Sequence, residues 1–129
     1  MIKPGMSCTI RRRVTEEMSA RAVGSGLADV LATPALIALM EEAAMNCVLP
    51  ELAAGQSTVG TRICASHDAA TPIGMEVSVT AKVIAVDRRK LTFDITARDD
   101  VEQISTATHD RFIIDFDKFQ KKADAKLCL

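Results

Sequence analysis

Hydrophobic residues between positions 33 and 50 recur at helical spacing. Thr33 is predicted to cap this helix, Pro34 suits its first turn and Pro50 ends it. A helix that is apolar around most of its circumference is buried within a fold rather than laid on a surface. The pattern therefore predicts one long helix wrapped by the rest of the chain, with apolar positions at Leu36, Ile37, Leu39, Met40, Ala43, Ala44, Cys47, Val48 and Leu49.

After Gly55 the hydrophobic period changes from helical to alternating, which predicts β-strands. In the second strand of this region the alternation shifts after Val83, which indicates a bulge. A Gly-Ser-Gly sequence favours a loop between the first strand and the helix, and the charged tail is either a short helix or frayed. The expected strands span residues 7–14, 57–68, 75–86, 91–99 and 101–116.

One strand, a long apolar helix and then four strands predict an α+β fold. The simplest arrangement is an antiparallel sheet curled around one central helix. A chain of 129 residues is sufficient for one domain, which we expect to span residues 1–129. Such a sheet has open edge strands, and pairing along an edge predicts a homodimer.

Composition and charge exclude several classes of function. The formal net charge of -1 provides no general basic field for nucleic acid, and no apolar run approaches the roughly 20 residues of a membrane span. The N-terminal segment lacks the apolar centre of a signal peptide, and four scattered cysteines show no metal-binding spacing. We therefore expect a cytoplasmic protein without a metal or cofactor. The basic clusters 11–13 and 88–90 are interpreted as a solvated strand end and a hairpin turn, or as contacts to an anionic ligand.

Glu41 is the first candidate for chemistry, because it lies on an apolar stripe of the predicted helix. A buried carboxylate is costly unless a donor or a cation accompanies it, and burial alone would raise its pKa. Such carboxylates suit general-base or nucleophilic catalysis. The alternative is a structural ion pair with an arginine across an interface. Its neighbour Glu42 falls on the polar side of the helix with Asn46, where exposure is expected.

Three further residues have both a functional and a structural interpretation. His67 lies at the end of a predicted strand, on the same face as Ile63 and Ala65. It is therefore interpreted either as lining a cleft or as a hydrogen-bonded core residue. Gly60 marks either a bulge or a close approach of a ligand to its backbone N–H. Thr33 is explained as a helix cap, although a helix N-terminus also stabilises a developing oxyanion. The remaining histidine, His109, lies in the middle of a strand and is interpreted as structural.

Three segments together resemble the hotdog-fold acyl-CoA thioesterases, and among them the fluoroacetyl-CoA thioesterase group. They are "LATPALIALMEEAA", "STVGTRICASHDAATPIGMEVSVTAKV" and "DRRKLTFDITARDDVEQISTATHDRF", within residues 30–119. The resemblance implies the hotdog fold and a dimer with its active sites at the subunit interface. It also implies that Thr33, Glu41 and His67 are catalytic and that the Gly60 amide binds the thioester carbonyl.

The resulting hypothesis is hydrolysis of a small or medium acyl-CoA thioester to a free acid and CoA. A non-catalytic acyl-CoA or small-ligand binding module is the alternative, and a hydratase or dehydratase on the same scaffold is a third possibility. Segment 19–30 lacks the phenylalanines of the fluoroacetyl-specific lid, so fluoroacetyl selectivity is not implied.

The spacing of Thr33 and Glu41 poses a geometric question. They lie eight positions apart, and that spacing corresponds to about 12 Å of helix rise. Either a bound acyl group and water span the gap, or the residues meet across a dimer, or Thr33 precedes the regular helix.

Overall fold

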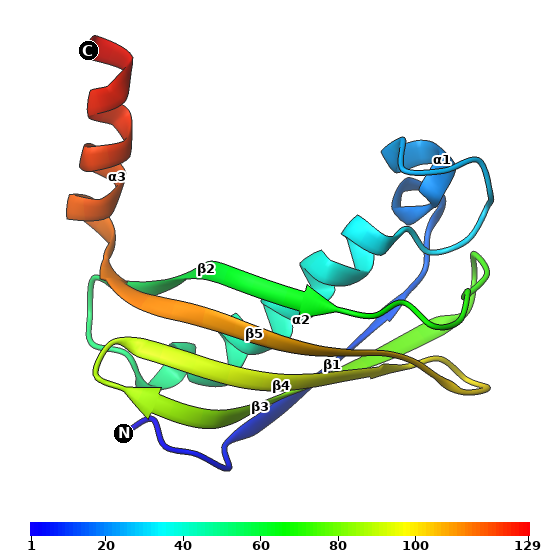
Figure 1. The fold of residues 1–129 in the computed structure, drawn as a ribbon, viewed down its shortest axis with the longest axis horizontal. Coiled ribbons are helices and arrows are strands. Elements are labelled where there is room, and N and C mark those ends of the chain that lie inside the picture. The colour runs from blue at the N-terminus through cyan, green and yellow to red at the C-terminus, as the bar shows by residue number, and fades with distance from the viewer.

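A single five-stranded antiparallel sheet curls around one long helix (Figure 1). The computed structural model describes all 129 residues. The strands are β1 (Ser7–Arg13), β2 (Gln56–Ala65), β3 (Glu76–Asp87), β4 (Lys90–Arg98) and β5 (Gln103–Asp115), in the sheet order β1-β3-β4-β5-β2. The sheet is therefore open at β1 and at β2. The expected α+β arrangement, an antiparallel sheet curled around one central helix, is confirmed.

The central helix α2 spans Thr33–Val48, as the apolar pattern predicted. Its buried side chains form one core with the inward-facing residues of the sheet. Leu36, Met40 and Val48 are almost completely inaccessible, as is Phe93 on β4. The helix ends before Pro50, which belongs to the short 3-10 turn Leu49–Glu51. Burial of this helix positions every candidate residue that it carries.

The ladders between neighbouring strands shift register at three places, one of which lies between Ala97 and Arg98 on β4. The other two were anticipated from the sequence. One lies between Val83 and Ala85 on β3, where the change in alternation predicted it. The other lies between Gly60 and Arg62 on β2, where a bulge was one of two interpretations of the glycine. Because the second bulge adds a residue to β2, the positions that face the core change from even-numbered before it to odd-numbered after it. Thr58 is buried before the bulge, whereas Ile63 packs against the core after it.

The regular part of β2 ends at Ala65, earlier than the predicted boundary at residue 68. The chain nevertheless continues beside β5, because the amides of Ser66 and Asp68 donate to the carbonyls of Thr106 and Ile104 at 2.9 and 2.8 Å. His67 therefore lies just beyond the strand end, held between two anchored neighbours.

The two ends of the molecule carry small helices. Residues 16–30 form a 3-10 turn (Glu16–Met18) and the short helix α1 (Ala20–Val23), where a loop was expected. The tail forms α3 (Phe116–Asp124) and a 3-10 turn (Ala125–Cys128), and it projects from the body as an arm (Figure 1). None of the helices combines the length and apolarity needed to cross a lipid bilayer.

A matched pair of leucines tests the central position of α2. Leu36→Ala removes a side chain that is 1% exposed, whereas Leu27→Ala alters one that is 92% exposed. We expect the first change to lower the free energy of unfolding by about 2–5 kcal/mol and the second by less than about 0.5 kcal/mol. Urea denaturation at a fixed protein concentration measures both. Equal effects of the two substitutions would contradict this description of the core.

Candidate active site

The carboxylate of Glu41 lies against the backbone of the β2 bulge. A Cβ built on Gly60 would stand 2.8 Å from Glu41 Oε2, closer than real side chains approach. Gly60 has an ordinary backbone conformation, so the glycine is required by this contact rather than by its torsion angles. The close neighbour of Gly60 is therefore a glutamate of the same chain. The interpretation of Gly60 as a bulge is confirmed, whereas approach of a ligand to its N–H stays a prediction.

Glu41 is less buried than its position on an apolar stripe implied. Its side chain is 44% exposed, because it lies where α2 passes beneath the bulge near the open edge of the sheet. The arginine that sequence reasoning placed across an interface is Arg111 of the same chain, with its Nη1 3.6 Å from Glu41 Oε2. The carboxylate thus faces both a cation and solvent.

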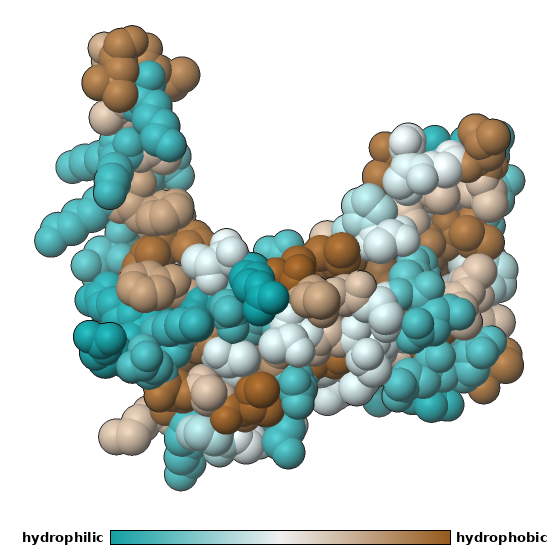
Figure 2. All heavy atoms as spheres, viewed as in Figure 1, coloured by the Kyte–Doolittle hydropathy of each residue, from teal (hydrophilic) through white to brown (hydrophobic).

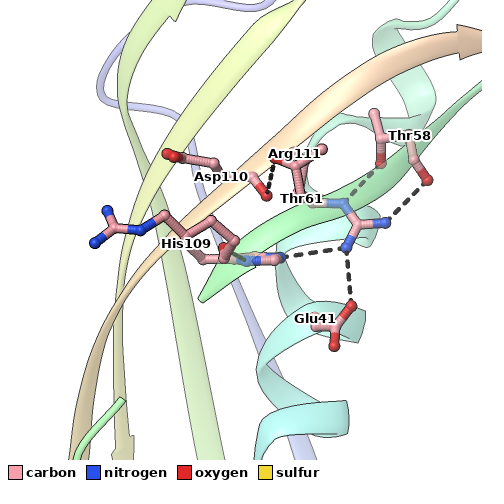
Figure 3. Close-up of polar contacts among 7 residues, drawn as sticks. Glu41, Thr58, Thr61, His109, Asp110 and Arg111 are labelled. Carbon is pink, nitrogen blue, oxygen red and sulfur yellow. Dashed lines mark hydrogen bonds and ion pairs between the residues drawn. The ribbon is translucent and has the colours of Figure 1, made fainter. Parts of the chain in front are cut away.

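Arg111 is fixed by Thr58 and His109 (Figure 3). It is 5% exposed, and its Nε and Nη2 donate to the Thr58 hydroxyl and carbonyl at 2.8 and 2.9 Å. Its Nη1 lies 3.3 Å from His109 Nε2. Burial lowers the pKa of Arg111, while Glu41 opposes this shift. The guanidinium therefore points towards Glu41 from a rigid support.

Arg111 and Thr58 were missed by sequence reasoning. The sequence signal that could have identified Arg111 is the alternation along β5. Every second residue there, including Ala107, His109 and Arg111, faces the interior. A cation at an inward-facing position requires a partner. His109 itself is 1% exposed, which agrees with the structural interpretation of that residue.

Thr33 and His67 form a second polar group at the N-terminus of α2. Thr33 Oγ1 lies 2.7 Å from His67 Nδ1. The prediction that Thr33 caps the helix is wrong: the cap position is Ala32, Thr33 is the first helical residue, and no side-chain capping bond forms. Its hydroxyl is directed to the histidine instead. The His67 Nε2 atom is buried and has no hydrogen-bond partner.

The two groups open into separate hollows of similar size. One, of about 280 Å³, is lined by Thr33 and His67 together with residues 30–32, 68–70, Ala20 and Ser25. The other, of about 290 Å³, is lined by Glu41, His109 and residues 60–63. They share no lining residue, and no hydrogen bond or ion pair joins Glu41 to Thr33 or His67. The structure therefore brings Glu41 and Gly60 together, and Thr33 and His67 together, but leaves the pairs apart within one chain.

Two other charged groups lie in the framework of the fold, and contact of residues 88–90 with an anionic ligand stays a prediction. Glu42 is partly exposed, as expected for the polar side of α2, and pairs with Arg12 of β1. Residues 87–90 form the hairpin turn between β3 and β4. No group of three or more His, Cys, Asp or Glu side chains is arranged to hold a metal ion.

Comparison with known proteins places this geometry in a family. Residues 14–117 match the family model described as fluoroacetyl-CoA-specific thioesterase. The fluoroacetyl-CoA thioesterase of Streptantibioticus cattleyicolor is 40% identical over 98 residues, which cover 76% of this chain and 70% of that protein.

Solved structures agree with the sequence relatives. A structure of the fluoroacetyl-CoA thioesterase FlK is 32% identical and superposes with a TM-score of 0.94 over 98% of both chains. A thioesterase superfamily member from Thermus thermophilus, at 23% identity, shares the fold with a TM-score of 0.88 over 100% of this chain and 98% of its own. The chain therefore belongs to the fluoroacetyl-CoA-specific thioesterase family and has the hotdog fold.

Proposed function

We propose that this protein hydrolyses small or medium acyl-CoA thioesters to a free acid and CoA. We further propose that it does so in the cytoplasm, as one hotdog domain spanning residues 1–129. Family membership supports the reaction class. The observation that carries the proposal is the half-exposed Glu41 carboxylate, which lies against Gly60 and faces the buried Arg111. A carboxylate in this setting is accessible to water and lies beside a fixed cation, which suits a general base.

In the proposed reaction Glu41 takes a proton from a water molecule whose oxygen attacks the thioester carbonyl. The resulting tetrahedral oxyanion is stabilised by backbone N–H groups, for which Gly60 is the candidate. The carbon–sulfur bond then breaks, the acid is released, and the proton held by Glu41 returns to the CoA thiolate. Access of solvent to the carboxylate favours this water-mediated route over direct attack by Glu41 to form an anhydride.

His67 is the proposed second polar contact to the substrate. When the Thr33 hydroxyl donates to Nδ1, the neutral ring carries its proton on Nε2. Because Nε2 is buried without a partner, it offers a hydrogen bond to the thioester carbonyl or to the leaving group. Thr33 thereby orients the histidine. This role follows from the hydrogen bond rather than from helix capping.

We propose that a second copy of the chain completes the pocket. Thr33–His67 and Glu41–Gly60 occupy different hollows within one chain, and β2 leaves its outer edge unpaired beside Gly60. Figure 2 shows a hollow along this side of the molecule, between the projecting C-terminal arm and the lobe around α1. A two-fold dimer in this hollow would bring Glu41 of each subunit towards Thr33 and His67 of its partner.

The C-terminal arm, residues 116–129, provides an apolar surface for the same dimer. Phe116 and Phe119 are 52% and 43% exposed, and Leu127 is 88% exposed. Lysines occupy other positions of α3, so the arm is amphipathic. An apolar face that stands away from its own core is expected to pack on the partner subunit.

Substitution of the catalytic candidates tests the reaction. Glu41→Gln is expected to lower kcat about 10²–10⁴-fold, since it removes the general base. His67→Ala is expected to lower kcat about 10²-fold, because one substrate hydrogen bond is lost. Release of CoA thiol from a panel of acyl-CoAs measures both rates. Glu42→Gln is the matched control and is expected to stay within about twofold.

The contrary outcomes of this test are distinct. If Glu41→Gln hydrolyses the panel as fast as the parent protein, Glu41 is not the base. If the parent is stabilised against heat by acyl-CoA but releases no thiol, the non-catalytic binding module is correct.

Gly60→Ala tests the contact between the bulge and Glu41. The added Cβ would meet the far end of a flexible side chain, so the carboxylate can swing away at little cost in stability. We expect kcat to fall at least about tenfold while the free energy of unfolding changes by less than about 2 kcal/mol. In the Glu41→Gln background the same substitution should have a much smaller effect on kcat. If Gly60→Ala lowers kcat by the same factor in the parent and in the Glu41→Gln protein, its effect is not exerted through Glu41.

Polar substitutions in the arm test the dimer. Phe116→Ser with Phe119→Ser is expected to shift sedimentation from dimer towards monomer and to make activity per subunit depend on protein concentration. Lys118→Ser with Lys121→Ser changes the same helix without removing aromatic side chains, and it should remain dimeric. An active parent protein that sediments as a monomer would contradict the proposal.

A further inference from the structure

His109 has a hydrogen-bonding state that its surroundings determine. Its Nδ1 lies 2.7 Å from the carbonyl oxygen of Arg62, next to the β2 bulge. A carbonyl oxygen only accepts hydrogen bonds, so Nδ1 carries the proton. In the neutral ring Nε2 is then an acceptor, and it faces Nη1 of Arg111 at 3.3 Å. Both contacts are satisfied by one tautomer of the neutral imidazole.

The same Nη1 atom lies 3.6 Å from Glu41 Oε2. Thr58 holds the other side of the guanidinium, so His109 and Thr58 together determine where Nη1 points. The ring of His109 also packs beside that of Phe93 in a tilted arrangement, with ring centroids 6.2 Å apart. A Cβ on Gly60 would also stand 3.2 Å from His109 Cε1, so the bulge glycine admits both the ring and the carboxylate.

We propose that His109 is a positioning residue for the reaction: its neutral Nδ1–H tautomer accepts from Arg111 and directs that guanidinium towards Glu41. This inference rests on the proposed function of Glu41 as the base. Protonation of His109 would place an N–H donor against the Arg111 N–H donors. Part of the fall in rate at acidic pH, the acid limb of the pH–rate profile, is therefore expected to come from protonation of His109 Nε2, which removes the acceptor for Arg111.

The charges around His109 agree with a neutral ring. Burial lowers the pKa of His109 from its ordinary value of 6.5, and the Arg111 cation acts in the same direction. The Arg62 carbonyl, Glu41 on α2 and the adjacent Asp110 oppose the shift. Because the folded-state pKa is lowered, the unfolded chain binds the proton more readily below pH 6.5, and the histidine makes the fold less stable as pH falls through that region.

Two substitutions separate positioning from packing. His109→Asn retains a donor near the Nδ1 position but loses the acceptor near Nε2, whereas His109→Gln can present a carbonyl oxygen near Nε2. We expect His109→Asn to lower kcat about tenfold with little change in KM, the loss of roughly one hydrogen bond to a charged group. His109→Gln should recover most of that loss. It should also flatten the acid limb and the decline of thermal stability below pH 6.5.

Two outcomes would overturn the inference. One is a His109→Asn protein with the kcat and acid limb of the parent. The other is an equal loss of kcat in both variants, matched to their losses of thermal stability, which would indicate packing alone. Activity of the Glu41→Gln protein is measured in parallel. A parent-like rate there would reject the base assignment rather than the hydrogen bonds of His109.

A spectroscopic measurement reads the tautomer without reference to activity. The chain has two histidines, so nitrogen-15 labelling of histidine gives two ring systems, which His67→Gln assigns. His109 is expected to show a protonated Nδ1 and an unprotonated Nε2 at neutral pH, and Arg111→Lys should change its Nε2 signal. A protonated Nε2 at neutral pH would contradict the proposal even if the enzyme were fully active.

Discussion

The contact between the Glu41 carboxylate and the backbone of Gly60 is the constraint on which the site depends. The missing side chain at Gly60 allows α2 to present a carboxylate to the edge of the sheet, at a distance where any Cβ would collide. The bulge at the same position places the Arg62 carbonyl against His109. One irregularity in β2 thus determines the position of the carboxylate and the tautomer of the histidine, and through that histidine the direction of Arg111.

The central helix α2 also keeps two groups of polar side chains apart. Thr33 and Glu41 are held about 12 Å apart by the rise of α2, and this helix is buried against the sheet. The hydrogen bond between Thr33 and His67 forms at one end of this span, while the Arg111 network forms farther along it. A single chain therefore keeps the two polar groups apart, and in the proposed dimer a second copy combines them. The unpaired edge of β2 and the apolar arm are both in a position to serve that assembly.

Local patterns were sufficient to predict the central helix and the five strands of this fold, but not the short helix α1. The apolar run and the prolines placed α2, and alternation placed the five strands and the β3 bulge, because each of these signals reflects burial of a local face. The boundary of β2 was less accurate, since Ser66 and Asp68 keep their bonds to β5 after the regular ladder ends. The family resemblance, rather than any pattern of charge, led to the reaction class.

The polar contacts were harder to predict because they depend on which strands become neighbours. Thr33 has the sequence context of a cap, yet its hydroxyl bonds to a histidine 34 residues away in the chain. Arg111 supports Glu41 only because β5 pairs with β2 above the helix, and no local spacing records that pairing. Glu41 was expected to be buried because its helical stripe is apolar. Exposure was decided instead by the open edge of the sheet nearby.

The central claim is that each pocket combines Thr33 and His67 of one subunit with Glu41 of the other. Mixing inactive His67→Ala and Glu41→Gln proteins, with exchange of subunits, tests it directly. A heterodimer of these variants has one fully wild-type pocket if the site is shared between subunits. Random pairing should then restore thiol release to about one quarter of the parent rate. If all three residues act within one chain, every pocket in the mixture remains defective, and no activity above that of the separate variants will appear.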